Sequence, residues 1–264
     1  MFVTSRGTRV LTAICVAIAV FLLAPIAVVV AAAVNDAPLL RFPPAGFSLR
    51  WFGEFFASGP FVEALWTSIW LAAGAALGAV LLGTAAAFAC TRRAVPGASG
   101  LRLLVLAPLQ LPHFLTAIAV LVLAHQVGWR GGAVLLLAAH TMIVLPYVFL
   151  TVSASVADFD LDVEHAARSL GARPARAFAE VTLPLTAAAV VSGGLMAFLM
   201  SFDEFPLSLL LAGTGYTPLP VQMYDYLRFE SDPVPAAASV ITIALAAAGL
   251  WLMSRLVGLG RVGR

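Results

Sequence analysis

The stretch Asp158–Pro184, DFDLDVEHAARSLGARPARAFAEVTLP, decides the fold because it is the one long polar interruption of an otherwise apolar chain. Three aspartates near its start are N-cap candidates and place negative charge on the first turn of a helix. That helix is predicted to run through Leu170, because Gly171 follows at a position where helices stop. Pro174 is placed to begin a second helix, and Pro184 to begin a third. The sequence therefore predicts a helix, a glycine hinge and further helix.

Charged and apolar residues alternate along this stretch in a pattern that suits docking to a protein. Arginines and glutamates surround an apolar set made of Ala166, Ala167, Leu170 and Phe178. A loop that is only solvated does not need such a set. We therefore expect the stretch to be where a membrane protein meets a soluble partner.

The spacing in this stretch resembles the EAA loop of ABC-type importer permeases, in which Glu-Ala-Ala precedes a glycine and a later Leu-Pro. Matching residues stand at Ala166, Ala167, Gly171, Val181, Leu183 and Pro184. His165 occupies the usual glutamate position, and Glu164 stands one residue earlier. In that family the loop docks in a groove of a separate ATPase subunit. The resemblance implies a coupling role for Glu164, His165, Ala166, Ala167, Gly171, Leu183 and Pro184.

The composition indicates a polytopic membrane protein of the all-α class. The chain of 264 residues is 62% hydrophobic and 11% charged, and its mean hydropathy is +1.01. A soluble globular domain would not tolerate these values. Outside the apolar runs no segment is long enough to bury a core of its own. We expect one transmembrane domain over residues 1–264, with residues 1–60 forming a first helix and external loop, 61–257 a five-helix permease core, and 158–184 a cytoplasmic coupling loop.

Six apolar runs are predicted to cross the lipid bilayer. They occupy residues 10–34, 61–89, 101–127, 133–157, 185–200 and 235–257. The first is too long for the core of a signal peptide, so we expect an uncleaved helix. Gly74, Gly78 and Gly83 in the second run allow close helix packing. Pro108 and Pro112 interrupt the third, and such breaks are tolerated where protein or a cavity supplies the lost hydrogen bonds.

The arginines indicate which side of the membrane each segment faces. All 15 Lys and Arg residues are arginine, and the net charge is +2. Because the arginines lie at membrane-flanking positions, they imply no nucleic-acid partner. If the N-terminus is inside, eleven are cytoplasmic: Arg6, Arg9, Arg92, Arg93, Arg102, Arg168, Arg173, Arg176, Arg255, Arg261 and Arg264. Four are external: Arg41, Arg50, Arg130 and Arg228. The positive-inside rule therefore predicts cytoplasmic termini and a cytoplasmic stretch 158–184.

An enzymatic function is not indicated. A Walker A loop needs a lysine to reach the phosphates, and this chain has none, so ATP hydrolysis must belong to another polypeptide. The sequence contains no Cys/His metal spacing, and no cofactor is expected. Cys15 and Cys90 lie inside or at the end of apolar runs, which does not support a disulfide.

Four polar residues within or at the ends of apolar runs are candidates for a substrate pathway: Asp203, Glu204, His140 and His113. Burying such groups in lipid is costly, so they usually face a cavity or a partner. The two carboxylates lie roughly 28 Å along the fifth helix from Pro184, and His140 lies roughly 10 Å deep from the same outer side. The plainer alternatives are the solvated end of a helix for the acidic pair and hydrogen-bonded structural roles for the histidines.

A second resemblance concerns the solute. Ser201-Phe202-Asp203-Glu204-Phe205, Gly213-Thr214-Gly215 and Leu219-Pro220-Val221-Gln222-Met223-Tyr224 resemble the spermidine/putrescine branch of these permeases. The resemblance implies a bacterial inner-membrane subunit that pairs with a second permease subunit, identical or homologous, with ABC ATPase subunits and an extracytoplasmic solute-binding protein. Permeases for aminoethylphosphonate, opine-like or amino-acid-like solutes look similar. A channel or a secondary transporter is the rival class.

Overall fold

A computed structural model describes residues 5–39, 41, 43–92, 95–129, 131–213 and 215–259. Four arginines of the predicted topology, Arg93, Arg130, Arg261 and Arg264, and Thr214 of the Gly213-Thr214-Gly215 motif lie outside these residues. Within the described ranges the regular secondary structure is helical, and one isolated bridge joins Asn35 and Phe47. The predicted all-α class is therefore confirmed.

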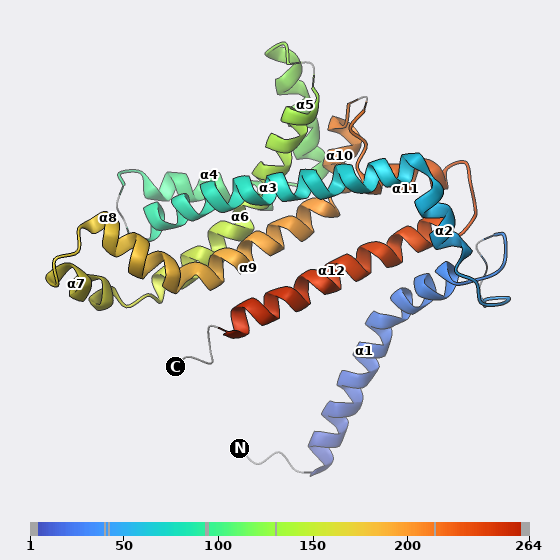
Figure 1. The fold of residues 1–264 in the computed structure, drawn as a ribbon, viewed down its shortest axis with the longest axis horizontal. Coiled ribbons are helices and arrows are strands. Elements are labelled where there is room, and N and C mark those ends of the chain that lie inside the picture. Colours follow the sequence, from blue (N-terminus) through green and yellow to red (C-terminus); the bar gives the residue numbers. More distant parts are fainter. Residues whose placement is uncertain are drawn as a thin grey trace. The chain divides into compact units, whose positions relative to one another are not determined.

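The helices follow one another along the chain as labelled in Figure 1. They are α1 (Ser5–Ala33), α2 (Arg50–Ala57), α3 (Gly59–Thr91), α4 (Ala98–Gln110), α5 (His113–Gln126), α6 (Ala133–Ala157), α7 (Leu161–Ser169), α8 (Pro174–Ala177), the π-helix η1 (Phe178–Thr182), α9 (Leu183–Phe202), α10 (Phe205–Leu211), α11 (Leu219–Leu227) and α12 (Val234–Leu259).

Five straight helical runs are long and apolar enough to cross a membrane. They are Thr8–Ala33, Gly59–Thr91, Ala133–Ala157, Pro174–Phe202 and Val234–Arg255. The sixth candidate is the pair α4 and α5, which meet at a bend of 113°. At about 1.5 Å per residue each of these two helices is shorter than a hydrocarbon core of about 30 Å. The predicted third span is therefore a broken one.

The two prolines of that span have different effects. Pro108 lies buried inside α4 without ending it. Pro112 has an extended backbone and precedes α5 directly, so the chain breaks there. Proline restricts the residue before it to extended conformations, and Leu111 is extended as well.

The chain forms two compact units. The first comprises Met1–Val62 and Met223–Leu245, and the second comprises Glu63–Gln222 and Ala246–Arg264. In the first unit the indole of Trp51 donates to the carbonyl of Asn35 over 2.7 Å. Phe55 and Phe61 are fully buried, and the ring of Tyr226 lies 5.1 Å from that of Phe61.

Close contact between α3, α6 and α9 builds the core of the second unit, and the three helices run beside one another in Figure 1. A Cβ added at Gly78 would lie 2.9 Å from Cγ2 of Thr141 on α6. One added at Gly83 would lie 3.0 Å from Cβ of Val148 and 3.2 Å from the carbonyl oxygen of Leu145. A side chain at either position would crowd α6, so the predicted role of these glycines in close helix packing is confirmed.

Local signals build the segment between α6 and α9 as predicted. The Asp160 carboxylate caps α7 by accepting the backbone N–H of Asp162 over 2.9 Å. Gly171 has φ +96°, and its N–H and that of Ala172 close a Schellman motif on the last turn of α7. Pro174 begins α8. The predicted helix, glycine hinge and helix are therefore present.

Pro184 lies in the first turn of α9, as predicted, but no break separates α9 from the helix before it. The chain is helical without a break from Pro174 to Phe202, and it passes through the π-helix Phe178–Thr182 just before the proline. Proline cannot donate to the carbonyl four residues earlier, and its ring crowds that carbonyl. A wider π turn, in which the N–H of Leu183 bonds to Phe178 O, accommodates Pro184 within a continuous helix.

Candidate functional site

Apolar side chains face outward on α7, beyond the membrane-spanning helices. Leu170, the residue that caps α7, is 90% exposed, and Leu161 and Val163 are also exposed. His165 and Ala166 are exposed beside them, and Ala167 is half-buried. Exposed apolar surface of this kind can mark a contact with another protein or with a membrane.

The remaining predicted coupling residues lie on the segments that follow α7. Leu183 and Pro184 are exposed at the start of α9. Between α7 and α8 an open groove of about 460 Å³ is lined by His165, Arg168, Ser169, Ala172 and Pro174. The Schellman turn at Gly171 separates the two helices and sets the angle at which α7 presents its apolar face.

Glu164 points into the chain and away from the outward face of α7. Its Oε2 lies 2.9 Å from Nη2 of Arg92, at the end of α3. The same oxygen accepts a 2.7 Å hydrogen bond from the hydroxyl of Thr182, the last residue of η1. The hydrogen bond from Thr182 and the nearby Arg92 guanidinium lower the pKa of the Glu164 carboxyl against the opposing effect of burial. Glu164 is therefore ionised near neutral pH and is engaged within its own chain.

Aromatic rings surround this ion pair. The guanidinium of Arg92 lies 5.4 Å from the ring centre of Phe88 and 5.9 Å from that of Phe159. Phe88 also meets Phe178 of η1 edge to face, with ring centres 5.0 Å apart. Side chains from the end of α3, from α7 and from η1 thus meet at one point. We call the three residues Arg92, Glu164 and Thr182 the Arg92 joint.

Glu204 lies at the opposite end of α9 and is buried. Its Oε1 caps α10 by accepting the backbone N–H of Leu207 over 3.1 Å. Its Oε2 lies 2.8 Å from Nδ1 of His113, the first residue of α5. The carboxylate therefore ties the broken span to α10.

His140 is buried in α6 and bridges two serines. Its Nδ1 lies 2.9 Å from the hydroxyl of Ser201, and its Nε2 lies 3.1 Å from the hydroxyl of Ser208. In a neutral imidazole one nitrogen donates and the other accepts, which the two hydroxyls can satisfy together. His140 thus joins α6 to α9 and α10.

Asp203 is exposed, unlike its neighbour Glu204. Asp203 ends α9 and Glu204 caps α10, so the turn between these helices directs the two side chains apart. Of the four candidates, the structure therefore brings His113 and Glu204 together. His140 lies on α6 and bonds to serines of α9 and α10. Asp203 is the exposed carboxylate.

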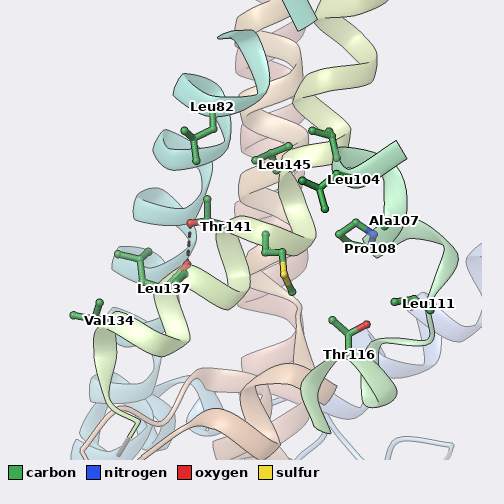
Figure 2. A pocket seen from close by; sticks show the side chains of 13 residues that line it. Leu82, Leu104, Ala107, Pro108, Leu111, Thr116, Val134, Leu137, Thr141 and Leu145 are labelled. Atoms are coloured by element: carbon green, nitrogen blue, oxygen red, sulfur yellow. Dashed lines mark hydrogen bonds between the residues drawn. The ribbon is translucent and has the colours of Figure 1, made fainter. Parts of the chain in front are cut away.

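An apolar hollow of about 650 Å³ lies between α3, α4, α5 and α6 (Figure 2). Its polar side chains are those of Thr116 and Thr141, and both hydroxyls are bonded to backbone carbonyls. In Figure 2 the dashed line marks the bond from Thr141 to Leu137 O. A hollow without charge does not suit an ionic solute, but it can hold an apolar side chain or a lipid chain.

No group of three or more His, Cys, Asp or Glu side chains gathers for a metal ion in the described part of the chain. Buried polar contacts of the second unit include two groups, one at the Arg92 joint and one made by His113, Glu204 and His140 near the opposite end of α9.

Broken and continuous apolar spans define a polytopic membrane protein, and outside these spans the capped helix α7 carries exposed apolar residues. The chain belongs to the family of binding-protein-dependent transport system inner membrane components, whose family model matches residues 79–258. It is therefore a transport subunit of the ABC permease type and not an enzyme, as the resemblance implied.

Characterised relatives are similar over most of the chain. The putrescine transport system permease protein PotI of Escherichia coli (strain K12) is 33% identical over 246 residues, covering 89% of this chain and 87% of the relative. The spermidine/putrescine permease protein PotC of Haemophilus influenzae is 31% identical over 212 residues, 80% of this chain and 82% of the relative. The molybdenum permease protein ModB of Mycobacterium bovis is 34% identical over 202 residues, 70% of this chain and 75% of the relative.

The fold is also that of a solved ABC importer. A bacterial ABC transporter that imports the acidic polysaccharide alginate matches with a TM-score of 0.68 and 16% identity, covering 97% of this chain and 98% of that chain. At this identity the likeness concerns the fold alone.

Four residues of these contacts were not singled out from the sequence: Arg92, Thr182, Ser201 and Ser208. Arg92 had been counted only as a topological charge, and Ser201 only as part of a quoted motif. Ser201 lies in α9 and Ser208 in α10, so their shared contact with His140 depends on the turn between these helices. Nothing local to Arg92 or Thr182 indicates that each pairs with Glu164.

Proposed function

We propose that this chain is the membrane-spanning permease subunit of an ATP-driven ABC importer and that α7 is the surface on which a separate ATPase subunit docks. The observation that carries the proposal is the exposed apolar face of α7, outside the membrane spans and fixed by the Schellman turn at Gly171. A channel or a secondary transporter does not need such a docking face.

The proposed assembly contains two permease subunits, two ATPase chains and an extracytoplasmic solute-binding protein. The family description names a binding protein, which supports that partner. A solved alginate ABC transporter with a TM-score of 0.69 forms a complex with a periplasmic protein that carries an alginate pentasaccharide. In the proposed topology α7 and both termini lie in the cytoplasm of a bacterial cell, and Asp203 lies at the outer side of the inner membrane.

The proposed solute is spermidine, putrescine or a related small amine. Two of the relatives are named for putrescine or spermidine/putrescine transport. The exposed carboxylate of Asp203 supplies a charge that attracts an ammonium group at the outer end of α9. Glu204, His113 and His140 form the wall behind it, because their polar atoms are already bonded to one another or to neighbouring serines.

An oxyanion is the second candidate solute, since the relative ModB is named for molybdenum transport. An exposed aspartate at the outer end of α9 repels an anion, so this candidate is disfavoured. Aminoethylphosphonate, opine-like and amino-acid-like solutes each carry an amine and would keep the role of Asp203.

Reconstitution tests the proposal. The chain is placed in proteoliposomes with the ATPase, second permease and binding protein encoded beside its gene, and uptake of radiolabelled putrescine, spermidine and molybdate is measured. We expect uptake of a polyamine that needs both ATP and the binding protein. Uptake of molybdate alone would overturn the solute assignment, and polyamine uptake without the ATPase would overturn the importer assignment.

A further inference from the structure

We propose that the Arg92 joint is a positioning device that transmits movement of α7 to two membrane spans at once, and that Glu164 acts through Arg92 and Thr182 without contacting the ATPase. The inference rests on the proposed function, because it takes α7 as the surface that the ATPase moves. It assigns roles to two residues that the motif does not specify: Arg92 lies outside the loop, and Thr182 stands between the motif positions Val181 and Leu183.

The position of the joint in the chain gives it this mechanical role. Arg92 directly follows α3, and Thr182 directly precedes α9. α7 is covalently joined to its neighbours only at its two ends, through the connection that follows α6 and through the turn at Gly171. Glu164, which bonds to both Arg92 and Thr182, instead connects the middle of α7 to the ends of both spans.

The environment of the ion pair makes its charge matter. The side chains of Arg92 and Glu164 are 23% and 12% exposed, and aromatic rings shield the guanidinium. The ion pair of Arg176 and Glu180 lies on the same segment at the same 2.9 Å separation, but its side chains are 69% and 60% exposed. Solvent screens an exposed pair strongly and a dehydrated pair weakly. The two pairs therefore form a natural comparison.

The π-helix contributes the third group. An additional residue in the turn shifts the helical register between α8 and α9, and Thr182, the last residue of that turn, directs its hydroxyl at Glu164. Pro184 favours the π turn, as argued above. The Leu-Pro end of the motif thus helps to place Thr182 at the joint.

The test compares Glu164→Gln with Glu180→Gln in the complete reconstituted transporter. Glutamine can still accept from Thr182 but carries no charge for Arg92. We expect the Glu164→Gln complex to assemble and hydrolyse ATP, with uptake per ATP lowered by about five- to tenfold. Amide hydrogen exchange in α7 should rise by about tenfold in the full-length permease. Glu180→Gln should change neither quantity.

A charge exchange adds a readout that a merely structural role would not produce. Arg92→Glu combined with Glu164→Arg should recover at least half of the lost uptake per ATP, whereas each single reversal should not. If Glu164→Gln fails to assemble, recovery in the exchanged pair supports the joint, and failure to recover overturns it.

The joint would also be overturned if the Glu164→Gln transporter kept the wild-type uptake per ATP and the wild-type rate of amide hydrogen exchange in α7. If the wild-type complex shows no ATP-dependent uptake, the proposed function fails. Amide hydrogen exchange in α7 then tests the joint by itself.

Discussion

Substitution of Glu204 separates a structural role from direct contact with the solute. Glu204→Ala removes the cap of α10, which is worth about 1 kcal/mol. It also removes the bond to His113, and a hydrogen bond to a charged group is worth about 1.5–3 kcal/mol. Because Glu204 is buried and makes both bonds, we expect a loss near the sum of these values. Glu204→Gln keeps the acceptor for Leu207 N, and its amide can still pair with His113, so its cost should be about 1 kcal/mol.

The assay combines stability and transport on the same samples. The denaturation midpoint of each purified variant is measured in lipid nanodiscs, and uptake of the solute is measured at equal amounts of assembled transporter. Glu204→Ala should lower both quantities, and Glu204→Gln should leave uptake within about threefold of wild type. Asp203→Asn should leave the midpoint unchanged and lower uptake at least about tenfold, which is 1.4 kcal/mol of transition-state stabilisation.

The outcome that refutes this reasoning is specific. If Glu204→Gln lowers uptake as strongly as Asp203→Asn while its denaturation midpoint stays at the wild-type value, the charge of Glu204 acts on the solute. The assignment of Glu204 to the wall behind Asp203 would then be wrong.

Three further predictions concern the hinge, the core and the topology. Gly171→Val should abolish uptake and weaken retention of the ATPase on purification, since φ +96° costs a residue with a Cβ about 1–2 kcal/mol; normal transport with the ATPase retained would rule out the hinge. Gly83→Leu should lower the denaturation midpoint by the equivalent of about 1–3 kcal/mol, because backbone atoms of α6 block the added side chain. Gly100→Ala, which meets nothing within 4 Å, is the matched control, and equal midpoints for the two would contradict the packing argument. A reporter enzyme inserted at Arg173 should be active only in the cytoplasm, and an external reading there would exclude docking to an ATPase.

The parts of the coupling segment that follow from neighbouring residues were predicted correctly. Asp160 caps α7 because its carboxylate reaches an N–H two residues away, and Gly171 ends the helix because its own backbone adopts φ +96°. Pro174 needs only its own ring to begin α8. Such signals are contained in a few consecutive residues, so the sequence alone reveals them.

Features that depend on distant residues could not be predicted in this way. Arg92 and Glu164 meet only after α3 and α6 have packed, so the inward orientation of Glu164 has no local signal. Pro112 by itself specifies only that the helix breaks, and it does not specify the 113° bend or the packing of α5 against the distant α10. Asp203 and Glu204 are adjacent in sequence, yet they separate because one helix ends and the next begins between them.

Photo-crosslinking from α7 tests the central claim, that this chain couples to a separate ATPase through that helix, most directly. A photoactivatable side chain replaces Ala167 in the assembled, transporting complex, and Asp203, at the far end of α9, serves as the control position. We predict a crosslink from position 167 to the ATPase chain whose yield changes with bound nucleotide, and no such crosslink from position 203. An active complex in which position 167 does not crosslink to the ATPase in any nucleotide state would contradict the claim.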